Sequence, residues 1–356
     1  MSAPTSTPAN GVRRILFKVI LLSLPFIVLM LTYLLLDPFR VVQHYRTYEK
    51  LTTAIPNRDF VSTQMYLNTY EKRPYQSFIL GNSRTLAFRI GDWEPYIHDT
   101  LAYHYDASGE SLYGVWKKLE FLEQHHSILK HVLLICDTQL LGETTDHDSH
   151  ITQKDPRTTG ASHLLFQLSF IKAYFSNAFF EKFLRQLMLG KFTPDMAEVL
   201  EKRRIFYDPV TNDIVLPDIN QEIKQDSLGF YARNTKLKTT RKPGISKAVI
   251  AAEQLRQLVA VRNILMRHHT DYQIVISPLF DQKQLNPADL AMLQRIFKAD
   301  RIHDYSGVNA FTSKIGNYYE DSHYRPIVGR AILKQIYTSS NYISSFNKGR
   351  AFDNSL

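Results

Sequence analysis

Short apolar runs alternate with helical patterns from residue 75 onward, and this alternation constrains the fold more than any other feature of the sequence. Residues 132–136 read VLLIC, and residues 273–277 form a second, largely apolar run. Runs without polar alternation are typical of strands buried on both faces of a parallel sheet. Residues 112–123 and 248–266 instead place apolar side chains at helical spacing. The order predicts an α/β fold, a parallel sheet with helices on both faces.

The other expected elements of this domain are strands over 77–80, 100–105 and 301–304 and helices over 287–297 and 326–337. Asn286 is a favourable N-cap residue, and Pro287 suits the first helical position because its missing N–H would have no helical partner there. Residues 145–245 interrupt the alternation with an aromatic-rich helical stretch and a polar segment, so we expect a helical insertion there. The α/β domain is therefore predicted over 75–345.

A single long apolar stretch precedes the domain. Residues 15–36 read ILFKVILLSLPFIVLMLTYLLL, about the length that crosses a ~30 Å hydrocarbon core. The stretch is long for a cleaved signal peptide, and no small-x-small cleavage site follows it. We therefore expect an uncleaved transmembrane helix.

The charges that flank this stretch predict its orientation. Arg13, Arg14 and Lys18 lie at its start, and positive charge favours the cytoplasmic side. We expect a short cytoplasmic tail over 1–14, a membrane-proximal linker over 37–74, and a main domain outside the membrane.

The charge and the cysteine content of the chain favour some kinds of partner and site over others. The net charge of +9 suits a surface beside anionic polymers or lipid. No compact Lys/Arg run with interleaved aromatics occurs, which argues against a nucleic-acid partner. Cys136 is the single cysteine, so no intramolecular disulfide can form, and within an apolar strand it behaves as a small hydrophobe.

Two short segments supply the parts of an activated serine. Ser83 follows a glycine turn at the end of the first expected strand, and His323 lies three residues after Glu320. A serine hydroxyl is weakly nucleophilic until a base removes its proton, and an acid must hold that base in one tautomer. We predict Ser83 as nucleophile, His323 as base and Glu320 as orienting acid, with Asp321 the alternative acid and Asp304 the next candidate.

Each segment also has a purely structural interpretation. Ser83 could be a helix N-cap, and residues 320–323 could be a polar loop that caps the next helix. Ser83, Gly109 and Asp137 all fall just after expected strands, however, and the carboxyl ends of parallel strands meet at one edge of the sheet, where sites form. That shared edge favours a common site.

Gly-Asn-Ser followed far downstream by acid-x-x-His resembles the SGNH (GDSL-like) hydrolase superfamily. The anchored architecture looks like membrane-tethered bacterial members related to teichoic-acid D-alanylation and alginate acetylation proteins. The likeness covers roughly residues 75–140 and 250–340. It implies a flavodoxin-like sheet, the triad roles given above, and an oxyanion held by the backbone N–H groups of Ser83 and Gly109. It implies no metal and no organic cofactor.

The sequence departs from this family pattern at two places. The third family block offers Gly-x-Asn-Asp, whereas the corresponding strand here leads into Asp137-Thr138-Gln139, without asparagine. Loss of one oxyanion donor costs roughly 10²–10³ in rate. Asn82 also replaces the usual Asp before the serine.

The resemblance leads to two functional expectations. The first is an extracytoplasmic serine esterase or O-acyltransferase at a bacterial cytoplasmic membrane, acting on an acylated cell-surface glycan beside a membrane-bound O-acyltransferase. The alternative is a weakly active or inactive SGNH-fold binding subunit of a polysaccharide-modifying complex. Residues 146–150 contain metal-ligand side chains, but no helical or strand spacing brings them together, so no metal site is predicted.

Overall fold

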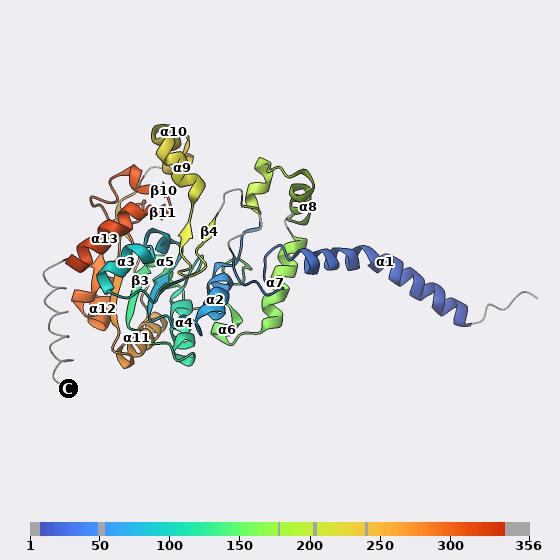
Figure 1. Cartoon of the computed structure of the whole chain (residues 1–356), viewed down its shortest axis with the longest axis horizontal. Helices are drawn as coiled ribbons and strands as arrows, with labels where there is room; N and C mark the ends of the chain where they lie inside the picture. Colours follow the sequence, from blue (N-terminus) through green and yellow to red (C-terminus); the bar gives the residue numbers. More distant parts are fainter. Residues whose placement is uncertain (1–7, 49–53, 177–178, 202–204, 239–240, 339–356) are drawn as a thin grey trace, which may run out of the picture.

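The strands expected from the apolar runs form one five-stranded parallel sheet at the centre of the main domain (Figure 1). The computed structural model describes residues 8–48, 54–176, 179–201, 205–238 and 241–338. The strand order is β2-β1-β3-β7-β9, and every neighbouring pair is parallel. The strands are β1 (Ser77–Gly81), β2 (Ala102–Asp106), β3 (His131–Cys136), β7 (Asp271–Ile276) and β9 (Ile302–Asp304).

Side chains of the central strands enter two hydrophobic cores, one on each face of the sheet. Leu134 belongs to one core and Leu133 to the other, because successive strand residues point to opposite faces. The larger core is covered by α2 (Arg58–Thr69), α4 (Leu112–Gln124), α11 (Ala252–Arg267) and α12 (Pro287–Phe297). The smaller core is covered by α3 (Ile90–Ile97) and α13 (Pro326–Thr338). The predicted α/β sheet with helices on both faces is confirmed.

Two boundaries of the main domain differ from the sequence expectation by four residues or more. Helix α11 begins at Ala252 rather than 248, because the N–H groups of Val249 and Ile250 donate to the Asp289 carboxylate instead of starting the helix. The linker expected over 37–74 contains α2, whose side chains Val61 and Met65 lie in the larger core. The packed unit therefore begins before residue 75.

The insertion is helical and has two parts. Its first part holds α6 (Pro156–Thr159), α7 (His163–Phe175) and α8 (Phe179–Leu189), and α7 and α8 lie beside the end of α1 that joins the domain (Figure 1). Its second part holds the hairpin β4 (Phe206–Tyr207) and β5 (Ile214–Val215), then α9 (Pro217–Gln225) and α10 (Ser227–Arg233). The remaining shorter elements of the chain are η1 (Ser83–Ala87), α5 (Thr138–Gly142), η2 (Pro194–Glu198), η3 (Thr235–Lys238), β6 (Gly244–Ile245), β8 (Lys283–Gln284), η4 (Ala299–Arg301), η5 (Ile315–Asn317), β10 (Tyr318–Glu320) and β11 (His323–Tyr324).

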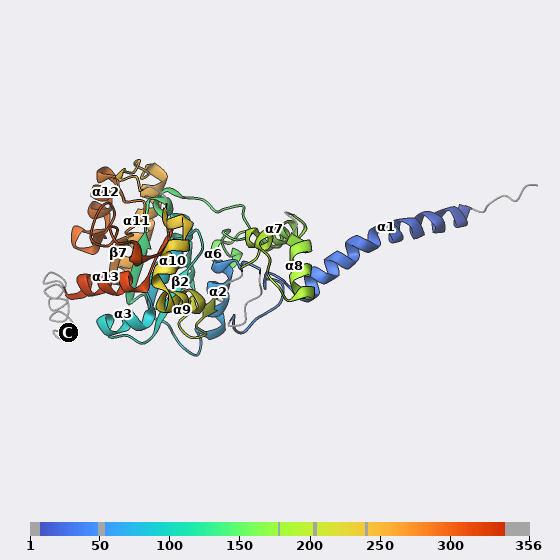
Figure 2. The same cartoon turned by 90° about the horizontal axis from the view of Figure 1, so that it is seen from above.

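Helix α1 (Pro8–Leu36) projects away from the domain as a single rod (Figures 1 and 2). Residues 11–36 are long and apolar enough to cross a membrane, and only 6% of the most apolar window is buried by protein. The helix starts inside the tail expected over 1–14. Residues 1–7 of that tail and residues 339–345 of the predicted domain lie outside the described part of the chain.

Candidate functional site

Ser83 lies at the carboxyl edge of the sheet, directly after β1. Gly81 ends this strand with a φ of 142°, and a Cβ atom there would lie 2.2 Å from the backbone oxygen of Ile135 on β3. Only glycine allows the chain to pass so close to its neighbour. Asn82 then caps η1 by accepting a hydrogen bond from the Arg84 N–H at 3.2 Å. The N-cap is therefore Asn82, and the half-buried Ser83 hydroxyl serves no capping role there.

His323 is brought to Ser83 by a two-stranded ladder, in which β10 and β11 place Glu320 opposite His323. The Nε2 atom of His323 lies 2.8 Å from Ser83 Oγ, and its Nδ1 atom lies 2.9 Å from Glu320 Oε1. When Nδ1 carries the proton and donates to the carboxylate, Nε2 is left free to accept from the serine. The structure thus joins Glu320, His323 and Ser83 in one hydrogen-bonded chain.

Glu320 has further partners that the sequence did not reveal. Its Oε1 accepts from the Ser322 hydroxyl at 3.2 Å, and its Oε2 lies 2.6 Å from Lys236 Nζ, which comes from η3. The hydrogen bond from His323, with that from Lys236, outweighs burial and holds the pKa of Glu320 well below its ordinary value. The carboxylate is therefore ionised at neutral pH and can stabilise an imidazolium.

The other acids lie elsewhere. Asp321 is exposed and faces a second pocket, which Arg84 and Arg241 also line. Asp304 accepts hydrogen bonds from the N–H and the hydroxyl of Ser306. Glu320 is the carboxylate that the structure places on His323.

Asp137 directly follows β3 and precedes α5, in the segment where the resemblance led us to expect an asparagine. Its Oδ1 caps α5 by accepting from the Leu140 N–H at 3.0 Å. Its Oδ2 accepts from Asn82 Nδ2 at 2.7 Å and lies 3.1 Å from Arg84 Nη1. Both Asp137 oxygens accept from neighbouring groups, so this side chain holds the turn around Ser83 in place and offers no donor to an oxyanion.

Gly109 follows β2 with a left-handed φ of 56°. Its carbonyl accepts from Lys154 Nζ at 3.3 Å. Its neighbour Ser108, rather than Gly109 itself, lines the pocket that contains Ser83. The loop that contains Gly109 therefore borders the pocket through Ser108, whereas Gly109 is not among the residues that line it.

The pocket in front of Ser83 has a volume of about 360 Å³. Its polar groups include Ser83, His323, Glu320, Arg58 and Asp106. Its apolar wall comes mostly from the insertion, with residues Leu86, Ile205, Tyr207, Ile214, Leu216, Ile219 and Tyr319. A largely apolar cleft with a few convergent polar groups is typical of a small-molecule or cofactor site.

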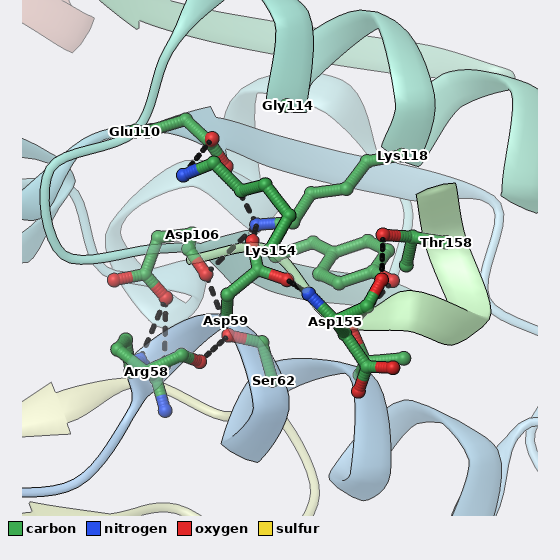
Figure 3. Close-up of polar contacts among 12 residues, drawn as sticks. Arg58, Asp59, Ser62, Asp106, Glu110, Gly114, Lys118, Lys154, Asp155 and Thr158 are labelled. Carbon is green, nitrogen blue, oxygen red and sulfur yellow. Dashed lines mark hydrogen bonds and ion pairs between the residues drawn. The ribbon is translucent and has the colours of Figure 1, made fainter. Parts of the chain in front are cut away.

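A buried charge cluster supports the loop that borders this pocket (Figure 3). Lys118 Nζ lies 3.0 Å from Asp59 and 2.7 Å from Glu110, and Lys154 Nζ lies 2.8 Å from Glu110. None of these four side chains is more than 1% exposed. Burial of this kind is tolerated only when each charge is paired.

The cluster also holds the backbone of the loop. Lys118 Nζ donates to the carbonyl of Asp106 at 3.1 Å, and the Ser62 hydroxyl donates to the same oxygen at 2.6 Å. Arg58 pairs with the Asp106 carboxylate at 2.7 Å. One signal of this cluster is visible in the sequence, because Lys118 lies on the apolar face of the helix expected over 112–123. A lysine there requires a buried partner.

The metal-ligand side chains of residues 146–150 have other contacts. Asp146 accepts from the Lys154 N–H at 2.8 Å, and His147 Nε2 lies 2.8 Å from Glu143. Within the described ranges, no group of three or more His, Cys, Asp or Glu side chains is arranged to hold a metal ion.

Comparison with known proteins adds no identity to this site. No protein-family model matches the chain, and no curated protein matches it in sequence. The function must be argued from the geometry.

Proposed function

We propose that this protein is an SGNH-type serine esterase or O-acyltransferase. The observation that carries the proposal is the continuous hydrogen-bonded chain from Glu320 through His323 to Ser83, with distances of 2.9 and 2.8 Å. A hydroxyl, a base and a base-orienting acid in this order are the parts of an activated serine. The chain opens into a pocket large enough for a small ester.

The reaction follows from the roles of these three side chains. Ser83 Oγ bonds to the ester carbonyl carbon while His323 Nε2 takes the hydroxyl proton. The tetrahedral intermediate expels the alcohol, which receives that proton and leaves an acyl group on Ser83. Water or a sugar hydroxyl then bonds to the acyl carbon and loses its proton to His323, after which the bond from that carbon to Ser83 Oγ breaks and Ser83 takes the proton back from His323. Glu320 stabilises the imidazolium in both steps, and the N–H groups of Ser83 and Gly109 are the proposed oxyanion donors.

The proposed substrate is an acyl group, acetyl or aminoacyl, on a cell-surface glycan or glycopolymer. Asp106 lines the pocket, and its Oδ2 has no hydrogen-bond partner among the described residues. A buried acceptor of this kind is costly unless something donates to it, and a polyhydroxylated substrate supplies such donors. The apolar wall suits the acyl part of the same ester.

The proposed location is the outer face of a bacterial cytoplasmic membrane, beside a membrane-bound O-acyltransferase partner. The charges Arg13, Arg14 and Lys18 at the start of α1 support this orientation. Protease added to spheroplasts should therefore digest the main domain. Protection of the domain would reverse the orientation and remove a surface glycan as substrate.

A second function is favoured by one observation. Asp137 takes the place of the asparagine donor and has its oxygens engaged by Asn82, Arg84 and Leu140. A site without this donor could bind an acylated glycan without turning it over, as a weakly active or inactive subunit of a polysaccharide-modifying complex.

Labelling with a fluorophosphonate probe separates the two functions. The probe should label the wild-type protein and Ser313→Ala, which changes an exposed serine, but not Ser83→Ala or His323→Ala. If folded wild-type protein stays unlabelled, Ser83 is not activated and the binding subunit is the better assignment.

A further inference from the structure

Part of the insertion carries more exposed apolar side chains than a domain surface in water normally presents. Helices α7 and α8 expose large hydrophobic side chains by 38 to 82% of their surface: Leu164, Leu165, Leu168, Phe175, Leu187, Met188 and Leu189. The other faces of the same helices are packed, since Phe166, Phe170 and Phe183 are buried. The two helices therefore have an apolar outer surface and a separate inner one.

The end of α7 also packs against α1, and Phe175, which is partly exposed, takes part in this contact. The ring of Tyr174 lies 5.2 Å from that of Tyr33, and its hydroxyl lies 3.0 Å from Thr32 Oγ1. The ring of Phe175 stacks on Phe26 at 5.6 Å. The end of α7 is thus fixed to α1 at two levels along the helix.

The second level lies within the length of α1 that a membrane would enclose. Residues 11–36 are the apolar stretch, roughly 39 Å long at 1.5 Å per residue. The hydrocarbon core takes up ~30 Å of that length. Phe26 lies ten residues before Leu36, or ~15 Å along the axis, so it cannot be outside the core while α1 spans it. Phe175, which stacks on Phe26, must then also lie at membrane depth.

The direction of α7 agrees with this depth. Figure 1 shows α7 running across the axis of α1, and Figure 2 shows it nearly end-on at the same junction. A helix across a membrane-spanning helix lies parallel to the bilayer surface, as interfacial helices do. Residues 163–191 contain four Lys or Arg residues and one acid, Glu181, a balance that suits anionic headgroups.

We infer that α7 and α8 are embedded in the outer boundary of the bilayer that α1 crosses, and that lipid covers their exposed apolar side chains. The inference rests on α1 as a membrane span and not on the esterase chemistry. The two contacts with α1 and the two membrane-embedded helices hold the domain at one height and tilt relative to the bilayer. The Ser83 pocket therefore has a fixed distance from the membrane surface.

Depth-dependent quenching tests this inference on the full chain. Met188→Cys and Leu165→Cys, at positions 82% and 67% exposed, are labelled with an environment-sensitive fluorophore. Leu228→Cys on α10, 89% exposed, is the matched control. The native Cys136 is 0% exposed, and unlabelled wild-type protein checks that it stays unreactive. The variants are reconstituted into vesicles of phosphatidylcholine and phosphatidylglycerol, with and without lipid that carries a nitroxide quencher on its acyl chain.

Dyes at positions 188 and 165 should show blue-shifted emission and should lose most of it to the quencher, whereas the dye at 228 should change little. Equal, weak quenching at all three positions would overturn the inference. If the dyes at positions 188 and 165 show blue-shifted emission in native membranes but not in lipid vesicles, the inference would also be overturned. The apolar surface would then be assigned to a protein partner. If the fluorophosphonate probe fails to label Ser83 while the dyes at positions 188 and 165 are still quenched, only the proposed function is contradicted.

Discussion

Lys118→Met is the sharpest test of the buried charge cluster. Lys118 Nζ contacts two carboxylates, Asp59 at 3.0 Å and Glu110 at 2.7 Å, and donates to the Asp106 carbonyl. Methionine has a similar length but no charge, so it leaves Asp59 and Glu110 with Lys154 as the one lysine of the cluster. Glu110 then keeps only Lys154, and Asp59 loses the lysine that pairs with it.

The expected cost is large. Removal of one partner from a buried ion pair costs about 3–5 kcal/mol, because the remaining charge is uncompensated. The matched control is Lys117→Met, one residue earlier on the same helix. Lys117 pairs with Glu120 at 2.8 Å, but the two side chains are 21% and 31% exposed, and pairs near the surface are worth about 1 kcal/mol or less.

Urea unfolding of the full chain in detergent micelles measures both variants. Tryptophan fluorescence is a suitable signal because Trp93 is fully buried in the smaller core. Lys118→Met should lower the free energy of unfolding by at least ~2 kcal/mol more than Lys117→Met, with an unchanged m-value. Equal effects of the two substitutions would refute the view that paired burial of Lys118 stabilises the domain.

Three further outcomes are expected. Glu320→Gln should lower esterase activity by up to ~10⁴, whereas Asp321→Asn should leave it nearly unchanged; the reverse order in a steady-state assay would transfer the acid role to Asp321. Gly81→Ala should destabilise the fold by at least roughly 1–3 kcal/mol, since its Cβ would meet the Ile135 oxygen at 2.2 Å, while Gly244→Ala, with nothing within 4 Å, should not; similar urea midpoints would contradict this. Burial alone would raise the pKa of Glu110, but Lys118 and Lys154 hold it at about 2, below the unfolded value of ~4.3. The stability that this pairing contributes is therefore complete above pH ~4.3 and is lost as the pH falls through the folded pKa of about 2. A urea midpoint that stays constant over this pH window would show that Lys118 and Lys154 do not hold the Glu110 carboxylate in its charged form.

The parts of the fold that depend on local pattern could be predicted from the sequence. Residues 132–136 are apolar throughout because β3 is covered on both faces. The bounds of α12 match because Asn286 and Pro287 mark its start. The pairing of Glu320 with His323 followed from a spacing that a two-stranded ladder can close.

The remaining features depend on contacts between distant segments. Helix α2 has low overall hydrophobicity and buries Arg58 and Asp59, so its sequence resembles a linker. Their partners are far along the chain, at Asp106 and Lys118. Lys236 likewise reaches Glu320 across 84 residues. No periodicity in the sequence encodes such pairs.

Ser83 and His323 are 240 residues apart in the chain, and this separation sets when the site can exist during biogenesis. A chain made at ~5–20 residues per second requires roughly 10–50 s to extend from one to the other. During that interval the serine has no base and cannot react with esters. Every product truncated before β11 lacks the base, even where β1 and β3 are present. If the proposed serine chemistry holds, fluorophosphonate reactivity would therefore report the arrival and docking of the last strands.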